Sequence, residues 1–71
     1  MFENEYEFVK SYIDSNGVNE STAIDMALDI DFNYLSYDNV YEEAKKYLSQ
    51  LDLDEDDIEE FLVTLKEYYD K

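Results

Sequence analysis

The 71-residue chain contains no cysteine, histidine, proline or tryptophan, and it has a single glycine. Without cysteine and histidine it can have no disulfide bond, no thiolate or imidazole zinc site, no nucleophilic cysteine and no histidine general base. Without proline, the helix ends must be marked by capping residues and by breaks in hydrophobic periodicity. Because little enzyme chemistry fits this composition, we predict that the protein is not an enzyme and holds no cofactor or metal.

Positive charge is also scarce. Five basic residues against twenty aspartates and glutamates give a net charge of −15 at neutral pH. Nucleic acids and anionic membranes are polyanionic and favour surfaces rich in lysine and arginine, so we expect no direct binding to either. A net charge magnitude of about 2 to 8 is enough to keep a small domain soluble. The excess beyond that range favours a basic protein as the partner.

Long apolar runs are missing as well, since no segment approaches the ~20 residues that cross a bilayer. The N-terminal residues Met1-Phe2-Glu3 lack the basic and then apolar pattern of a signal peptide. We therefore expect a cytoplasmic protein. Hydrophobic residues still make up 45% of the chain, which is enough to predict a folded domain rather than a disordered one.

Hydrophobic periodicity predicts an all-α fold, a compact single domain of about four short amphipathic helices at roughly residues 2–15, 20–29, 38–51 and 55–69. Asn16-Gly17 is predicted to end the first helix, Asn19 to cap the second and Asp54 to cap the last. Residues 30–37 are predicted to be a loop with buried aromatic side chains. The expected core faces comprise Phe2, Tyr6, Val9 and Ile13; Ala23, Ile24, Ala27 and Leu28; Tyr37, Val40, Tyr41, Ala44, Tyr47, Leu48 and Leu51; and Ile58, Phe61, Leu62, Leu65 and Tyr69.

The densest acidic segment runs from Asp52 to Glu60. The spacing of Asp52, Asp54 and Asp56 resembles the start of an EF-hand calcium loop, but Asp57 stands where that loop needs glycine and Val63 where it needs a bidentate carboxylate. Paired carboxylates can also hydrolyse glycosides, yet these acids fall on predicted outer faces rather than in a cleft. Part of the density is explained by acids that complement the positive end of a helix dipole.

Outward positions on the last helix recur every three or four residues, about 5 to 6 Å apart, and they are Asp56, Glu60, Val63 and Glu67. This is a plausible spacing for carboxylates that imitate successive phosphates. A second acidic cluster lies at the N-terminus, with a phenylalanine beside it as an apolar anchor. Phe8 and Tyr12 lie together on a flank of the first predicted stripe, where they either widen the core face or form an exposed aromatic pair. The predicted partner-binding residues are Asp52, Asp54, Asp56, Asp57, Glu59, Glu60, Val63 and Glu67, together with Glu3, Glu5, Glu7 and Phe8. Among the eight tyrosines, Tyr12, Tyr34 and Tyr68 lie off the predicted core stripes and are further candidates for contact with another protein.

In size, charge, tyrosine richness and helical character, the chain resembles the small acidic DNA-mimic inhibitors of phages and mobile elements, a class that includes anti-restriction and anti-CRISPR proteins. The resemblance covers the whole chain and rests on no motif. It implies a stoichiometric inhibitor that occupies the basic nucleic-acid-binding surface of a host defence nuclease or another DNA-binding protein. If the gene is phage-encoded, the expected location becomes the cytoplasm of the host cell.

Two alternatives use the same composition. An immunity-type protein would neutralise a basic toxin or nuclease through the same electrostatic attraction, and a toxin gene next door would favour it. A structural or regulatory oligomerisation module would instead turn part of its apolar stripes towards a sister chain. In that case sedimentation would show a homodimer whose stability depends on concentration.

Overall fold

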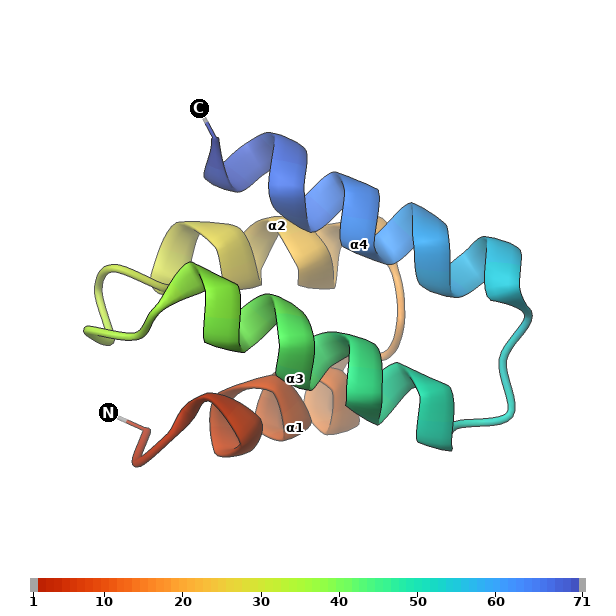
Figure 1. Cartoon of the computed structure of the whole chain (residues 1–71), viewed down its shortest axis with the longest axis horizontal. Helices are drawn as coiled ribbons and strands as arrows, with labels where there is room; N and C mark the ends of the chain where they lie inside the picture. The colour runs from red at the N-terminus through yellow and green to blue at the C-terminus, as the bar shows by residue number, and fades with distance from the viewer. Residues whose placement is uncertain (1, 71) are drawn as a thin grey trace.

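The computed structural model describes residues 2–70, and within that range it has four helices and no strand (Figure 1). The helices are α1 (Glu5–Asn16), α2 (Glu20–Asp29), α3 (Tyr37–Gln50) and α4 (Glu55–Tyr69). The predicted all-α fold is confirmed. Helix α1 begins three residues later than predicted, because the Asn4 side chain accepts a hydrogen bond from the backbone N–H of Glu7 at 2.8 Å and caps the helix there.

Two of the three predicted caps are confirmed. Gly17 ends α1 with φ at 85°, and its N–H donates to the Ile13 carbonyl at 2.8 Å. Asn19 caps α2 by accepting a hydrogen bond from the Thr22 N–H at 2.9 Å. Asp54 occupies the predicted N-cap position of α4, but its side chain makes no capping hydrogen bond, so this cap is confirmed in position only. The start of α4 still carries acids in its first turn, where they complement the helix dipole.

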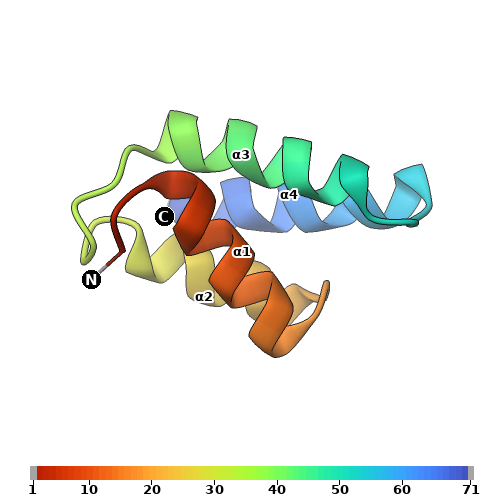
Figure 2. The same ribbon diagram turned by 90° about the horizontal axis from the view of Figure 1, so that it is seen from below.

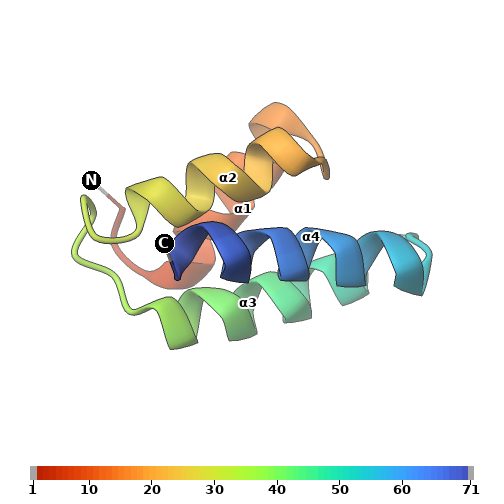
Figure 3. The same ribbon diagram turned by 90° about the horizontal axis from the view of Figure 1, so that it is seen from above.

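The helices pack as a ring in which each one contacts two neighbours: α1 lies against α2 and α3, and α4 lies against the same two helices. The molecule measures 30 × 24 × 19 Å. In all three views, the loop between α2 and α3 lies at one end of the long axis with the start of α1, whereas the loop between α3 and α4 lies at the opposite end (Figures 1, 2 and 3). Helix α4 therefore runs along the long axis between the two ends.

The core lies inside this ring. It consists of Phe8, Val9, Ile13, Ala23, Met26, Ala27, Ile30, Val40, Ala44, Leu48, Phe61, Leu62 and Leu65. The residues buried on α3 and α4 all belong to the predicted stripes. On α1, however, Phe8 is fully buried while Tyr6 is 40% exposed, so the buried arc of α1 is displaced from the predicted stripe towards Phe8. Phe8 is therefore a core residue, and its prediction as an apolar anchor for a partner is wrong.

Helix α2 is rotated relative to its predicted orientation. Met26 is fully buried, whereas Leu28, predicted to face the core, is 64% exposed. The buried positions Ala23, Met26, Ala27 and Ile30 follow a regular three- and four-residue spacing. The prediction chose a stripe displaced by about one residue, which turns the helix by roughly 100°.

The loop after α2 also differs from its prediction, because its aromatic residues Phe32 and Tyr34 are 80% and 84% exposed. The helical turn continues past the end of α2, where the Asn33 N–H donates to the Asp29 carbonyl at 3.0 Å. With helical spacing, Ile30 and Asn33 are the residues that point inward and are buried. The alternating pattern of the sequence suggested buried aromatics, but the local backbone follows the helical period.

Candidate protein-binding surface

The acidic side chains are spread over the surface. All twenty lie within residues 2–70, and none of them is buried. In this part of the chain, lysines form two ion pairs with acids: Lys10 with Asp14 at 2.7 Å and Lys46 with Glu43 at 3.6 Å. The other eighteen carboxylates make no ion pair with a lysine among the described residues. Most of the negative charge is therefore not neutralised within the fold.

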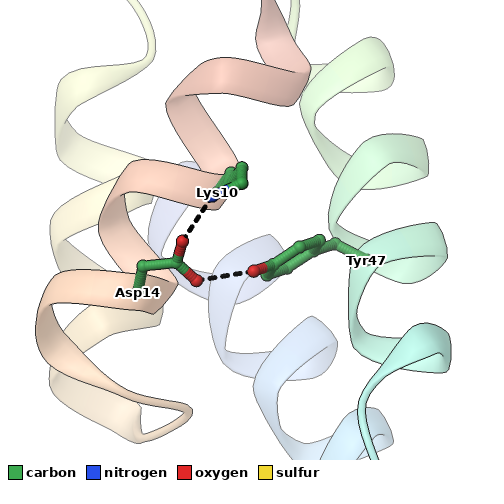
Figure 4. Close-up of polar contacts among 3 residues, drawn as sticks. All are labelled: Lys10, Asp14 and Tyr47. Atoms are coloured by element: carbon green, nitrogen blue, oxygen red, sulfur yellow. Dashed lines mark hydrogen bonds and ion pairs between the residues drawn. The ribbon is translucent and has the colours of Figure 1, made fainter.

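Asp14 is one acid whose interactions serve the fold. One carboxylate oxygen accepts from the Lys10 ammonium on α1, and the other accepts from the Tyr47 hydroxyl on α3 at 2.5 Å (Figure 4). These bonds, that of Lys10 first and that of Tyr47 second, lower the pKa of Asp14, and the same bonds raise the pKa values of Lys10 and Tyr47. Asp14 links two helices and is not a candidate for partner binding.

The predicted N-terminal cluster is divided by the structure. Glu3 and Glu7 are exposed, but Glu5 is half-buried and accepts hydrogen bonds from the Ser36 N–H at 3.4 Å and the Asn39 amide at 3.5 Å. The pKa of Glu5 is lowered, first by its own backbone N–H and then by Ser36 and Asn39, against the opposing effect of partial burial. Glu5 therefore ties the start of α1 to the start of α3.

The acids predicted around α4 are all exposed. They are Asp52 and Asp54 in the preceding loop and Asp56, Asp57, Glu59, Glu60 and Glu67 on the helix, with Val63 among them at 48% exposure. The 15 residues of α4 carry six carboxylates and one lysine. Over a helix length of ~22 Å, this is one net negative charge per ~4.5 Å, compared with one per ~3.4 Å along a DNA strand.

The two edges of α4 differ in charge. On the α2 side, Asp57 and Glu60 line a groove of about 250 Å³ with Glu20 from the start of α2, and no lysine of residues 2–70 lines it. On the α3 side, Glu59 lines a groove of about 400 Å³ that includes Lys45. The structure thus separates residues that the sequence placed in one cluster. We define the acidic face by the acids on the α2 side and on the outer surface of α4, which are Glu20, Asp56, Asp57, Glu60 and Glu67.

Glu20 is the residue of this face that sequence reasoning missed. It lies 37 residues before Asp57, and the two come together only because α2 packs on α4. No local pattern in the sequence indicates that contact. Across residues 2–70, no three carboxylates converge closely enough to hold a metal ion. The negative charge of the acidic face is therefore distributed over its length rather than concentrated at one point.

Among the described residues, no helix is both long enough and apolar enough to cross a membrane. Comparisons with protein-family models, with curated proteins and with solved structures find no match for this chain.

Proposed function

We propose that the protein is a stoichiometric inhibitor that binds the basic nucleic-acid-binding surface of another protein by nucleic-acid mimicry. The observation that carries this proposal is the acidic face, where acids from α2 and α4 adjoin and no lysine in the described part of the chain lines the groove between the two helices. The linear charge density of α4 is comparable to that of a nucleic-acid strand. A surface of this kind matches the cationic clefts that bind phosphate backbones.

Rigidity supports the same function. Four of the five acids of the acidic face lie on α4, whose Phe61, Leu62 and Leu65 are anchored in the core. Carboxylates held on a packed helix lose little backbone freedom when they bind, so less of the attraction is offset by ordering. Long-range attraction between opposite charges would speed association, and added salt would slow it.

Capture from a lysate of the source cells tests the proposal. The immobilised protein is expected to retain a nucleic-acid-binding protein, identified by mass spectrometry, at low salt. Duplex DNA added as a competitor should release it, because the mimic and the DNA occupy the same basic surface. If the only proteins retained have no nucleic-acid-binding surface, or if DNA fails to displace them, the proposal is wrong.

A matched pair of variants separates a specific face from net charge alone. Glu60→Lys with Glu67→Lys reverses two charges on the acidic face, and Glu42→Lys with Glu43→Lys makes the same change on α3, beside Lys45 and Lys46. The first pair should abolish capture while the second pair retains most of it. Equal losses from both pairs would show that net charge, rather than the acidic face, determines binding. Circular dichroism verifies that each variant remains helical.

A further inference from the structure

Three large apolar side chains stand out from the surface at the end of the molecule where α2 leads into α3. Leu28, Phe32 and Tyr34 are 64%, 80% and 84% exposed. Leu28 and Phe32 are four residues apart in a helical turn that continues through Asn33, so they lie on the same side of it. We call these three residues the apolar corner.

The exposed apolar area is comparable to the largest apolar patch of a typical monomer. The two aromatic residues alone expose on the order of 300 Å², whereas the largest apolar patch on a typical monomer covers roughly 300–600 Å² and is often functional. Tyr12 and Tyr68, the other two tyrosines predicted as contacts, are both partly buried against the core. Of the three tyrosines singled out by the sequence, Tyr34 is the one that the fold leaves at the surface.

Tyr34 also occupies a backbone position that favours glycine. Its φ is 58°, and it is the only residue besides glycine with positive φ within residues 2–70. The Leu35 N–H donates to the Ile30 carbonyl and the Tyr34 N–H to the Asp31 carbonyl, both at 3.1 Å. This pair of bonds is the Schellman ending of a helix, in which the residue at the position of Tyr34 is usually glycine. Fold stability alone would favour glycine there, so the tyrosine ring requires another explanation.

The charge around the corner specifies the partner. No lysine or arginine occurs between Lys10 and Lys45, and this stretch includes eight acids. Asp31 lies within the corner, and Glu5 accepts a hydrogen bond from Ser36 immediately after it. A second copy of the chain would bring the same acids face to face, and like charges opposed in this way disfavour a symmetric interface. Anionic lipids and nucleic acids are repelled for the same reason.

We propose that the apolar corner is a hydrophobic anchor that inserts into an apolar recess bordered by lysines or arginines on the partner protein. The inference rests on the proposed function, because it assigns the anchor to the same basic partner. It adds that the partner surface is not uniformly polar. A few well-packed aromatic residues commonly dominate binding energy, while surrounding charges govern steering and specificity.

Three synthetic peptides of equal length test this chemistry by nuclear magnetic resonance with isotope-labelled protein. The Lys–Leu peptide is amphipathic and cationic, the Lys–Ser peptide has the same charge without apolar residues, and the Glu–Leu peptide has the opposite charge. The Lys–Leu peptide should shift the amide signals of residues 28–35. The Lys–Ser peptide should shift the amide signals of the acidic face and leave those of the apolar corner unchanged. The Glu–Leu peptide should not bind.

Variants then assign the contact to side chains. Phe32→Ser combined with Tyr34→Gly should weaken Lys–Leu binding at least about tenfold, as expected for loss of an aromatic anchor. Tyr6→Ala, which removes a ring that is 40% exposed on α1, should leave the affinity unchanged. Equal weakening by Tyr6→Ala, or signal shifts by Lys–Leu that avoid residues 28–35, would overturn the proposal.

Three further outcomes are decisive, and the last two separate this inference from the proposed function. A concentration-dependent dimer that disappears in the corner variant would overturn the inference in favour of a second copy of the chain. If the Lys–Leu peptide binds at the apolar corner but duplex DNA releases no protein in the capture experiment, the proposal of nucleic-acid mimicry is wrong and the proposal of the anchor is supported. If DNA releases the captured partner but the corner variant binds that partner as tightly as the natural chain does, the proposal of the anchor is wrong and the proposal of mimicry is supported.

Discussion

Replacing Tyr34 with glycine is expected to give a more stable protein than replacing it with alanine, the reverse of the usual order. At most exposed positions alanine is the more stabilising residue, because glycine gains more conformational freedom in the unfolded chain. Tyr34 has φ at 58° and closes the Schellman ending after α2. In that conformation an L-residue has its Cβ too close to the following carbonyl oxygen, and glycine does not. Tyr34→Gly should therefore be more stable than Tyr34→Ala.

The magnitude follows from two opposing terms. The left-handed conformation destabilises the folded state by roughly 1–2 kcal/mol for an L-residue such as alanine. Glycine lowers the free energy of unfolding by about 0.4–1 kcal/mol relative to alanine, because its unfolded chain has more conformational freedom. Both variants remove the same ring, so its packing cancels in the comparison. Glycine should exceed alanine by about 0.5–1 kcal/mol in free energy of unfolding. For a domain of this size, 1 kcal/mol moves Tm by roughly 4–8 °C.

Urea denaturation followed by circular dichroism measures the difference, and thermal melting provides an independent value. The matched control is Glu42, which is exposed in the middle of α3. At that position the free energy of unfolding of Glu42→Ala should exceed that of Glu42→Gly by about 1 kcal/mol, because alanine is the more favourable residue inside a helix. If alanine proves more stable than glycine at both positions, Tyr34 does not have the left-handed conformation and the reasoning about its strain is refuted.

Three further changes test other parts of the fold. Phe8→Ala should lower the free energy of unfolding by about 3–5 kcal/mol because it empties a core position; an unchanged urea midpoint would place Phe8 outside the core. Tyr37→Phe should raise the free energy of unfolding by roughly 1 kcal/mol, since the buried Tyr37 hydroxyl has no hydrogen-bond partner within residues 2–70; a loss of stability would reveal such a partner. The native pKa of Asp14 is lowered, so the stability lost in Asp14→Asn should be greatest above the unfolded pKa of about 3.9 and should vanish as pH falls through the native value. A deficit that persists at pH 2 would contradict that linkage.

The helices could be predicted because their signals are local. Asn19 and Gly17 act within a few residues of themselves, and the apolar stripes of α3 and α4 follow the helical period closely. The predicted and observed bounds of α2 and α4 are identical. The late start of α1 depends on Asn4, a capping residue whose effect is also local but which the apolar pattern from Phe2 obscured.

The orientation of α1 and α2 could not be predicted in the same way. Which arc of a helix is buried depends on how many neighbours it contacts, and α1 contacts two. Phe8 and Tyr6 are both aromatic, and only the position of α2 and α3 determines that Phe8 enters the core. Leu28 is apolar like Met26, yet the contact with α4 selects Met26.

The candidate surface shows the same division. The exposed acids of α4 could be predicted from its amphipathic pattern, because residues opposite the core stripe face solvent. The contribution of Glu20 depends on tertiary packing, and the exposure of Phe32 and Tyr34 depends on a helical ending with an unusual residue in it. The sequence predicts burial for Phe32, and it places Tyr34 both in a loop of buried aromatic residues and among the candidates for contact with another protein. The surface therefore combines a feature that the sequence displays with two that arise on folding.

Under the proposed function, the placement of the two surface features sets a minimum size for the target. The apolar corner and the acids that begin α4 lie at opposite ends of a molecule 30 Å long. At a rise of ~3.4 Å per base pair, that length equals about nine base pairs of duplex. A protein whose cleft spans fewer base pairs can engage one end only, whereas a longer cleft can accommodate both at once. The chain would then discriminate among basic proteins by the footprint they make on DNA.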